Sequence, residues 1–445
     1  MFSDTSSSKE SIQSDADSLT DAGVYSEHLS EVNRKNKVRA TRNIYNQNGV
    51  LLVAKGIEIT PKIATTIAQH KLQKPIEHDI NLEKVVNSDK LYDELLKLLE
   101  NDDELGLIYE KLQLKKTLLA CCEYYSRYNI IVQKITVMST QCPRLYYRSL
   151  ICSLLALAVC RCSENSELDK REAFVAALIR DMGFLHLPHE ISVKDGNFTP
   201  EEEKAIKSHP LVAKLILDEV KEIPSTIKIA VTEHHERNDG TGYPRSKKGR
   251  AISLLGHLLA MCNDIQELCR TEEDSIQQYF GNLEPFIAMN TFSHTEEVAQ
   301  SVQNMLYLVQ LPVVRIIDDS KMLELLEKLE VRSAELGIVF EELKSFVDSY
   351  SVKENGESVA VALGSALSNT LIQSGLLSEV YVRWIVYVKE SELKSAYEEM
   401  ESVKLMHQEL LKQFNRVVAS CFQSKLSSVN EFGLHMQNQL QNLSI

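Results

Sequence analysis

The chain lacks three things: long apolar runs, a net positive charge and cysteines at the spacing of a structural zinc site. Its longest apolar run, at 150–159, already contains a cysteine and a serine, so no membrane span is expected. The net charge of −14 argues against nonspecific binding of nucleic-acid polymers, which needs a broad basic surface. Residues 1–21 are rich in serine and aspartate and lack the basic and apolar regions of a signal peptide, which predicts a cytoplasmic protein.

The cysteines do not form a zinc-binding pattern. None of the nine follows another at the Cys-x-x-Cys spacing of a structural zinc site. Most of them stand at apolar positions of helical patterns, which predicts reduced and buried side chains. Cys160 and Cys162 are one residue apart, and this spacing leaves a redox role open.

Chemically rich side chains gather instead in residues 234–244. This stretch reads HHERNDGTGYP, with two adjacent histidines followed by acidic and amide side chains and two glycines. Imidazole nitrogens are good ligands for iron, manganese and zinc, and a glycine-rich loop lets backbone approach a ligand closely. A polar turn after a helix is the simpler alternative. We interpret the stretch as a metal or ligand site.

The stretch 234–244 resembles the signature HHExxDGxGYP of the HD-GYP family, and it meets every fixed position. The resemblance extends back through 176–183, Pro188, the helix start at 199–202 and His209-Pro210, in the family's order, and it covers roughly residues 140–270. Members of the family are bacterial metal-dependent phosphodiesterases that open cyclic di-GMP. The resemblance therefore implies an all-α domain with a metal centre.

The chain departs from the family where the His-Asp-x-Gly-Lys motif is expected. Arg180 stands in place of the histidine and Phe184 in place of the lysine. A guanidinium is not deprotonated in proteins, so it cannot ligate a metal ion. The family takes another ligand from a helix about 30 residues earlier, but the window 144–151 contains neither histidine nor glutamate. The family's late aspartate falls on Asn263, with Asp264 one residue out of register.

The losses fall on one metal of the family's two-metal centre. The resemblance assigns the ligands of the other metal to Asp181, His209, His234 and His235, with Asp181 also the catalytic carboxylate that bridges both ions. These four residues predict a site for one iron, manganese or zinc ion, and the sequence leaves open whether the ion is retained. Two metals roughly 3.5–4 Å apart normally activate water and stabilise the leaving oxygen, so one metal beside Arg180 predicts a strongly reduced rate.

The resemblance also predicts a pocket for cyclic di-GMP or a related dinucleotide. In the family the glycine-tyrosine-proline loop lines the substrate pocket and is associated with docking of diguanylate cyclase domains. Two readings of Arg180 stay open: an ion pair with a nearby carboxylate, or bidentate binding of a phosphate. His186 and His189 are expected to be ordinary polar residues, with ligation as the alternative. The candidate ligand-binding residues are Arg180, Arg237, Asp239, Gly240, Gly242, Tyr243 and Pro244.

A basic cluster follows the signature in a chain that is otherwise acidic. Such a cluster suits the phosphates of a dinucleotide or an acidic partner face, and an ordinary solvated loop is the alternative. Its members are Arg237, Arg245, Lys247, Lys248 and Arg250.

The organisation of the chain is predicted to be mainly α. Residues 1–33 are expected to be disordered, being polar and rich in serine. Residues 34–85 form a small α+β domain with a hairpin turning at Asn48-Gly49 and a helix after Thr60-Pro61, and residues 86–138 form a helical connector. The HD-GYP-like domain then spans 139–320.

Residues 321–445 are predicted to be a helical carboxy-terminal region. Apolar residues recur there at spacings of three and four, as in a coiled-coil seam or a helix packed on its own domain. A homodimer is therefore one prediction. The stripe comprises Leu393, Ala396, Met400, Val403, His407, Leu410, Phe414, Val417 and Cys421.

Three functions are compatible with these patterns, so the sequence alone leaves enzymatic activity open. The first is a degenerate HD-GYP signalling protein that binds nucleotide or a cyclase partner with little or no hydrolysis. The second is a slow phosphodiesterase that uses one remaining metal. The third is an interaction scaffold without metal or ligand.

Overall fold

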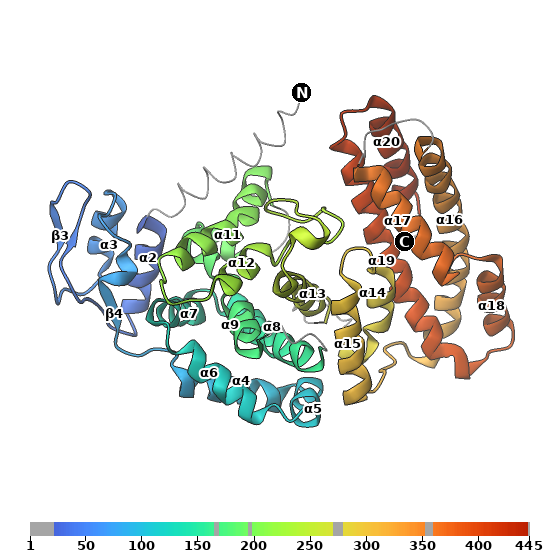
Figure 1. Cartoon of the computed structure of the whole chain (residues 1–445). Coiled ribbons are helices and arrows are strands. Elements are labelled where there is room, and N and C mark those ends of the chain that lie inside the picture. The colour runs from blue at the N-terminus through green and yellow to red at the C-terminus, as the bar shows by residue number, and fades with distance from the viewer. Residues whose placement is uncertain (1–21, 164–168, 195–197, 270–278, 352–358, 444–445) are drawn as a thin grey trace. The chain divides into compact units, whose positions relative to one another are not determined.

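The computed structural model describes residues 22–163, 169–194, 198–269, 279–351 and 359–443 (Figure 1). Helices dominate these residues, and the strands form two sheets of two strands each. The prediction of a mainly α protein is confirmed. The chain divides into two compact units, the first comprising 1–237, 242–267 and 300–309, and the second comprising 238–241, 268–299 and 310–445.

The first unit begins with a small α+β domain. Its elements are α2 (Ala22–Asn33), β1 (Val38–Ala40), β2 (Ile44–Tyr45), β3 (Leu51–Val53), α3 (Pro61–Ala68), η1 (Ile76–His78) and β4 (Ile80–Leu82). The predicted hairpin is confirmed, because β2 pairs with β3 across the turn that contains Gly49, whose φ is +78°. The predicted helix after Pro61 is confirmed as well, with Thr60 as its cap. The antiparallel pairing of β1 with β4 joins segments about 40 residues apart and was not predicted.

Helix α2 corrects the prediction that the chain is disordered up to residue 33. Tyr25, Leu29 and Val32 follow one another at spacings of four and three, and all three are buried. Their helical face was hidden among serines and acidic residues, so composition alone suggested disorder. Residues 1–21 lie outside the described residues.

Helices make up the rest of the first unit. They are α4 (Ser88–Asn101), α5 (Asp103–Lys111), α6 (Lys115–Tyr125), α7 (Asn129–Gln141), α8 (Pro143–Cys162), α9 (Lys170–Ile179), η2 (Met182–His186), α10 (His189–Val193), α11 (Pro200–Asp218), α12 (Ser225–Glu233), η3 (Gly249–Ala251) and α13 (Leu254–Cys269). Helix α11 begins with a complete capping box between Thr199 and Glu202, as its sequence indicates.

Most residues of helix α8 are buried in this unit. Among the described helices it is the single one long and apolar enough by itself to cross a membrane, and 83% of that apolar window is buried. The bent pair formed by α17 and α18 would pass the same test if it were one span. Burial of α8 on neighbouring helices such as α9 gives it the character of a core helix. All nine cysteines are buried and free, as predicted.

The second unit is helical and has its own core. Its elements are η4 (Phe280–Asn282), α14 (Glu284–Met289), α16 (Asp319–Ser351), α17 (Val359–Ser374), α18 (Glu379–Glu390), η5 (Lys394–Ala396), α19 (Tyr397–Phe422) and α20 (Ser427–Gln441), while α15 (Glu296–Val309) has residues in both units. The apolar stripe of α19 packs into the core of its own unit, against residues of α16, α17 and α20. Of the two predicted arrangements, a coiled-coil seam or a helix packed on its own domain, the structure shows the second.

The boundary between the two units does not coincide with the predicted domain boundary at residue 320. Residues 268–299 group with the carboxy-terminal helices, because α14 packs against α19 and Met289 belongs to the same core. The predicted domain therefore contained two helical segments that contribute to different cores.

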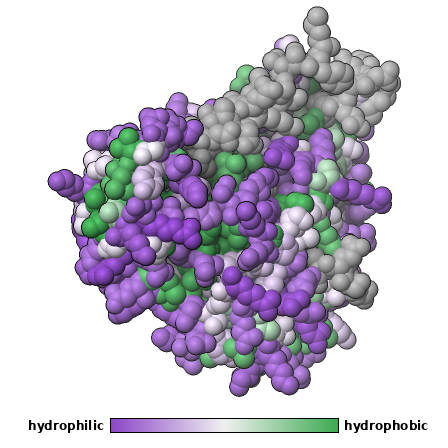
Figure 2. All heavy atoms as spheres, turned by 60° about the vertical axis from the view of Figure 1, so that its left-hand side comes forward, coloured by the Kyte–Doolittle hydropathy of each residue, from purple (hydrophilic) through white to green (hydrophobic). Residues whose placement is uncertain are grey.

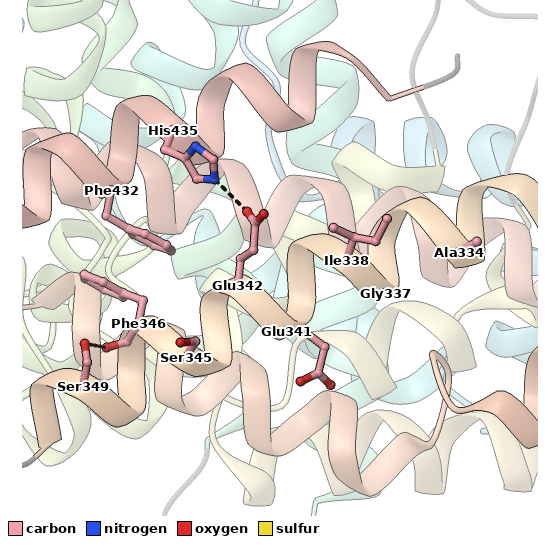
Figure 3. Close-up of a pocket in the computed structure, with 10 residues that line it drawn as sticks. All are labelled: Ala334, Gly337, Ile338, Glu341, Glu342, Ser345, Phe346, Ser349, Phe432 and His435. Carbon is pink, nitrogen blue, oxygen red and sulfur yellow. Dashed lines mark hydrogen bonds and ion pairs between the residues drawn. The ribbon is translucent and has the colours of Figure 1, made fainter.

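An open groove of about 830 Å³ runs between α16 and α20 in the second unit. Figure 3 shows Phe346 and Phe432 facing each other at one end, with their rings 3.8 Å apart and parallel, and His435 bonded to Glu342 beside them. The groove contains none of the predicted site residues. In the face turned forward in Figure 2, hydrophilic residues predominate and the hydrophobic areas are small and separate.

Candidate metal centre

The four predicted ligands come from three segments of the first unit. Asp181 lies between α9 and η2, His209 lies within α11, and His234 and His235 follow α12. The absence of a side chain at Gly183 lets η2 approach α11, since a Cβ there would lie 2.1 Å from the carbonyl oxygen of His209. This contact brings the segment of Asp181 against the helix of His209.

The side chains of the four residues converge. One potential ligand atom from each lies within 4.8 Å of those of the others, and this is the single such group of His, Cys, Asp or Glu in the described residues. Asp181 Oδ1 lies 3.5 Å from His209 Nε2 and 3.6 Å from His234 Nε2. Three imidazoles and a carboxylate at this spacing suit iron, manganese or zinc.

Hydrogen bonds at the far side of two rings orient their nitrogens for a cation. His209 Nδ1 donates to the carbonyl of Ile206, and His234 Nδ1 donates to that of Val231, each at 2.6 Å. Because carbonyls only accept, the protons belong on Nδ1 and the Nε2 atoms carry lone pairs. These two Nε2 atoms face each other at 3.1 Å. Two lone pairs and a carboxylate oxygen at such distances fit a bound cation.

Burial also favours the neutral, ligating form of the adjacent histidines. It lowers the pKa of His234 to about 4 and the pKa of His235 well below its usual value, with nearby histidines adding to the effect. Although burial opposes ionisation of Asp181, the Arg180 guanidinium holds the pKa of that carboxyl well below its usual range. Asp181, His234 and His235 are therefore in the protonation states that a metal ion requires.

Arg180 occupies the other side of Asp181. Its side chain is fully buried, with Nη2 3.0 Å from Asp181 Oδ2 and Nη1 donating to the carbonyl of Ala177 at 3.2 Å. Its Nε has no hydrogen-bond partner within the described residues. The two carboxylate oxygens of Asp181 are thus divided, one toward the imidazoles and one toward the guanidinium.

No further ligand reaches the cluster from the two other places where the resemblance expects one. Tyr146, in the upstream window, donates its hydroxyl to Glu94, and Tyr147 is exposed. Asn263 donates to Glu267 at 3.3 Å. The neighbouring Asp264 is held by a bidentate ion pair with Arg237.

Ion pairs reduce the positive charge of the predicted basic cluster. Arg237 is partly neutralised, and Lys247 pairs with the buried carboxylate of Glu233. The exposed basic residues that remain are Arg245, Lys248 and Arg250.

Two buried glutamates shape the signature loop, and the sequence analysis gave neither of them a role. Glu236 accepts backbone N–H groups from Arg245 at 2.7 Å and from Lys247 at 2.8 Å. Glu233 accepts the backbone N–H and the hydroxyl of Ser253. The available signal was their position, since Glu236 lies within the signature and Glu233 directly precedes it, and buried carboxylates need several donors.

Tight backbone packing explains one of the signature glycines. A Cβ at Gly242 would lie 2.3 Å from the carbonyl oxygen of His235, so this position has no room for a side chain. Tyr243 stacks on the His235 ring at 4.5 Å and donates its backbone N–H to the His235 carbonyl. Pro244, next to it, is buried and follows a cis peptide bond. Gly242 and Tyr243 thus support a proposed ligand.

The loop tip at 238–241 belongs to the second unit. Asp239 accepts the backbone N–H of Thr241 at 2.8 Å and its hydroxyl at 2.6 Å, and also the Ser293 hydroxyl at 3.1 Å. Gly240 has a φ of +83°, which a side chain would strain. Asp239, predicted to bind ligand, is engaged in holding this turn.

Two further side chains lie where sequence reasoning gave little guidance. Phe184, at the position of the family's lysine, stacks on the His209 ring at 4.2 Å. His186 is buried but is not one of the four converging residues; it bonds Lys134 at 2.7 Å. The prediction for this position is an ordinary polar residue. Nothing in the sequence indicates the buried contact, because Lys134 and His186 are 52 positions apart.

Comparison with known proteins finds a family match in the central region of the chain. Residues 133–278 match the family described as HD domain. A cyclic di-GMP phosphodiesterase of Pseudomonas aeruginosa is 32% identical over 118 residues, 26% of this chain and 28% of that protein. A Thermotoga maritima cyclic di-GMP phosphodiesterase is 35% identical over 105 residues, 23% of this chain and 28% of that protein.

A phosphodiesterase specific for 3′3′-cGAMP, from Vibrio cholerae, is 32% identical over 130 residues. That match covers 29% of this chain and 28% of the relative. The chain therefore spans little more than a quarter of the length of each of these three relatives.

A helical domain that brings together one aspartate and three histidines is characteristic of the HD superfamily, whose members depend on metal ions. The central region of the chain, residues 133–278, is a domain of this superfamily. Its histidine signature and its cyclic dinucleotide phosphodiesterase relatives assign it more closely to the HD-GYP family.

Proposed function

We propose that this protein is an HD-GYP signalling protein that binds one metal ion and a cyclic dinucleotide, with little or no hydrolysis. The observation that carries the proposal is the division of the Asp181 oxygens. Oδ1 faces His209 and His234, while Oδ2 lies 3.0 Å from Arg180 Nη2. In the family this aspartate bridges two cations, and here a guanidinium takes the place of one of them.

The remaining cation site has the donors of one iron, manganese or zinc ion. Asp181, His209, His234 and His235 would hold it, and a bound ion would supply Lewis acidity to a phosphoryl oxygen. Tyr243 stacks on the ring of His235, one of these four side chains, and so helps to fix its orientation. Arg180 contributes a fixed positive charge but no activated water, which is the physical reason to expect binding with slow turnover.

Unused hydrogen-bonding capacity supports recognition of a phosphodiester. Arg180 Nε has no hydrogen-bond partner within the described residues, so it has one N–H group to donate to a phosphate oxygen. Arg245, Lys248 and Arg250 are exposed and basic in a chain of net charge −14. A cyclic dinucleotide is therefore the ligand class that we propose, and an acidic face of a cyclase domain is a possible partner class for the same basic residues.

Titration calorimetry of cyclic di-GMP into anaerobically purified protein tests this proposal. The metal content of the same sample is measured, and the nucleotide is recovered and examined for linear dinucleotide or GMP. We expect about one metal ion per chain and binding without appreciable cleavage. Absence of both metal and nucleotide binding would contradict the proposal and leave the interaction scaffold.

A reversal of the two departures tests whether they limit turnover. In Arg180→His with Phe184→Lys, the site regains the imidazole and the amine that the family carries at these positions. We expect the double variant to cleave cyclic di-GMP faster than the wild-type protein. An unchanged rate would shift the cause to Asn263 or to the missing upstream ligand.

The convergence of all four ligands also favours a second candidate, a slow one-metal phosphodiesterase. Its test is the accumulation of linear dinucleotide over long incubations, compared between wild-type protein and His235→Ala. A wild-type rate that disappears in the variant would establish the enzyme. Equal background rates would exclude it.

A further inference from the structure

A second group of buried titratable residues lies outside the metal centre, in the first unit. Glu77 comes from η1 of the small α+β domain, Lys134 from α7, and His186 from the end of η2. The Lys134 side chain is fully buried, and those of Glu77 and His186 are 7% and 5% exposed. We call these three residues the interface triad.

Lys134 is at the centre of the triad. Its ammonium pairs with Glu77 Oε1 and lies 2.7 Å from His186 Nε2, and His186 Nε2 lies 3.7 Å from the same glutamate oxygen. The ammonium is also 3.1 Å from the centre of the Tyr25 ring. Tyr25, from α2 of the α+β domain, stacks on His186 with ring centres 5.2 Å apart. Two elements of the α+β domain therefore hold His186 and Lys134.

The charges of the triad depend on one another. A lysine ammonium only donates, so His186 Nε2 accepts and the ring proton belongs on Nδ1. Burial lowers the pKa of His186 to about 4, which agrees with a neutral ring. Although burial opposes ionisation of Glu77, the Lys134 ammonium holds its pKa well below the usual range. Loss of Glu77 would leave an uncompensated buried ammonium beside His186.

The triad includes one end of the segment that follows Asp181. Helix η2 begins at Met182, directly after Asp181, and ends at His186. Gly183 lies against the backbone of His209 and Phe184 stacks on the His209 ring. Helices α2 and α7 pack on the same short segment. A five-residue 3₁₀ helix has few internal hydrogen bonds, so its position depends on these outside contacts.

From this geometry we infer that Glu77, Lys134 and His186 are positioning residues for the metal centre, through which the α+β domain holds Asp181 in place to bind a metal ion. The inference rests on the proposed function in so far as it requires a metal site. It assigns a role to the α+β domain: it completes the support of the HD domain's metal centre.

The experiment compares Glu77→Gln with wild-type full-length protein by Mn²⁺ titration calorimetry and by hydrogen exchange of the metal-free protein. Loss of a residue that orients metal ligands typically weakens metal affinity roughly 10–100-fold, and we expect a loss in this range. We also expect faster exchange of the backbone amides of Phe184 and Leu187, which close η2 by bonding the carbonyls of Asp181 and Phe184.

A matched control is Glu58→Gln in the same α+β domain. Glu58 pairs with Lys37 and Arg39, which all lie in that domain, so we expect unchanged Mn²⁺ affinity and unchanged exchange of η2. A second pair of variants separates positioning from general stability. His186→Gln keeps an acceptor for Lys134 and should retain most of the Mn²⁺ affinity, whereas His186→Leu removes the acceptor and should not. These variants also serve if Glu77→Gln does not fold.

Wild-type Mn²⁺ affinity and wild-type exchange of η2 in folded Glu77→Gln or His186→Leu would overturn the inference. Equal losses in His186→Gln and His186→Leu would also overturn it, because the Lys134 contact would then be irrelevant. If the wild-type protein binds no Mn²⁺, the proposed function fails separately. The exchange of η2 in the metal-free variants still decides whether the triad holds that segment.

Discussion

At the scale of single residues, Asp181 determines what the centre can bind. One of its oxygens faces the imidazoles that would hold the metal ion, and the other lies beside the Arg180 guanidinium. A buried ionised carboxylate without a positively charged partner would destabilise the protein, so the Arg180 guanidinium supports the ionised state of Asp181. The chemistry of the site therefore follows from how this one carboxylate is shared.

Replacement of His234 by alanine is predicted to abolish metal retention. The His234 Nε2 atom lies beside both Asp181 and His209, so the change removes a ligand and leaves a gap among the others. We expect the Mn²⁺ affinity to fall by more than the roughly 10–100-fold typical of outer-shell changes. Calorimetry and metal analysis measure it. His435→Ala, at an exposed position paired with Glu342, is the control, and a variant that keeps wild-type affinity would remove His234 from the ligand set.

At the scale of elements, the close approach of η2 to α11 joins the aspartate to the first histidine. Neither segment is unusual by itself, since α11 is a well-capped amphipathic helix and η2 is a short 3₁₀ turn. Their contact is possible because residue 183 is glycine. The distance between Asp181 and His209 thus depends on a backbone contact.

Gly183→Ala is predicted to destabilise the first unit and weaken metal binding together. The added Cβ would lie 2.1 Å from the His209 carbonyl oxygen, so one backbone must move. Overpacking of this kind costs about 1–3 kcal/mol. Thermal unfolding and Mn²⁺ titration are the measurements. Gly337→Ala within α16 meets nothing within 4 Å and should be neutral or stabilising by up to about 1 kcal/mol. Wild-type behaviour of Gly183→Ala would disprove the close contact.

The packing of α19 against α16 contains a buried histidine that makes stability depend on pH. His407 is fully buried beside Ser333, and burial lowers its pKa to about 4. The unfolded side chain takes up a proton near pH 6.5, whereas the folded one does so near pH 4. Its contribution to stability is therefore present above pH 6.5 and is lost as the pH falls toward 4.

His407→Leu is predicted to flatten this pH dependence. Between pH 7.5 and pH 5 the variant should lose about 2 kcal/mol less unfolding free energy than the wild-type protein, because one proton-binding group is removed. Urea unfolding can be followed by the fluorescence of Trp384, the single tryptophan, which packs on the same core. An identical pH dependence in both proteins would show that folding does not lower the pKa of His407.

At the scale of the whole molecule, the chain forms two units, each with its own core. The first contains the candidate metal centre and the interface triad, and the second contains the core around α19. The chain enters the second unit briefly at 238–241, inside the signature loop. The two halves of the predicted central domain therefore depend on different sets of packing contacts.

Phe414→Ala is predicted to destabilise the second unit and leave metal binding intact. Phe414 is fully buried in α19, and such a truncation costs about 3–5 kcal/mol. We expect a lower urea midpoint of the Trp384 signal. Mn²⁺ affinity, measured where both proteins are folded, should match that of the wild type. A parallel loss of affinity would show that the metal centre depends on the second core.

The sequence by itself determined the family, the mainly α class and the four candidate ligands that converge, because these depend on local patterns: the histidine signature, its glycines and the helical periodicity. It also identified Arg180 as incompatible with a metal ligand, since that follows from guanidinium chemistry. Tertiary structure decided what these residues contact. The sequence does not reveal which side chains are buried or which ones meet. This applies to the Arg180–Asp181 pair, the Arg237–Asp264 pair and the Glu77–Lys134–His186 triad. The packing of the α19 stripe on its own unit was decided the same way, because one apolar stripe suits either a partner helix or a core.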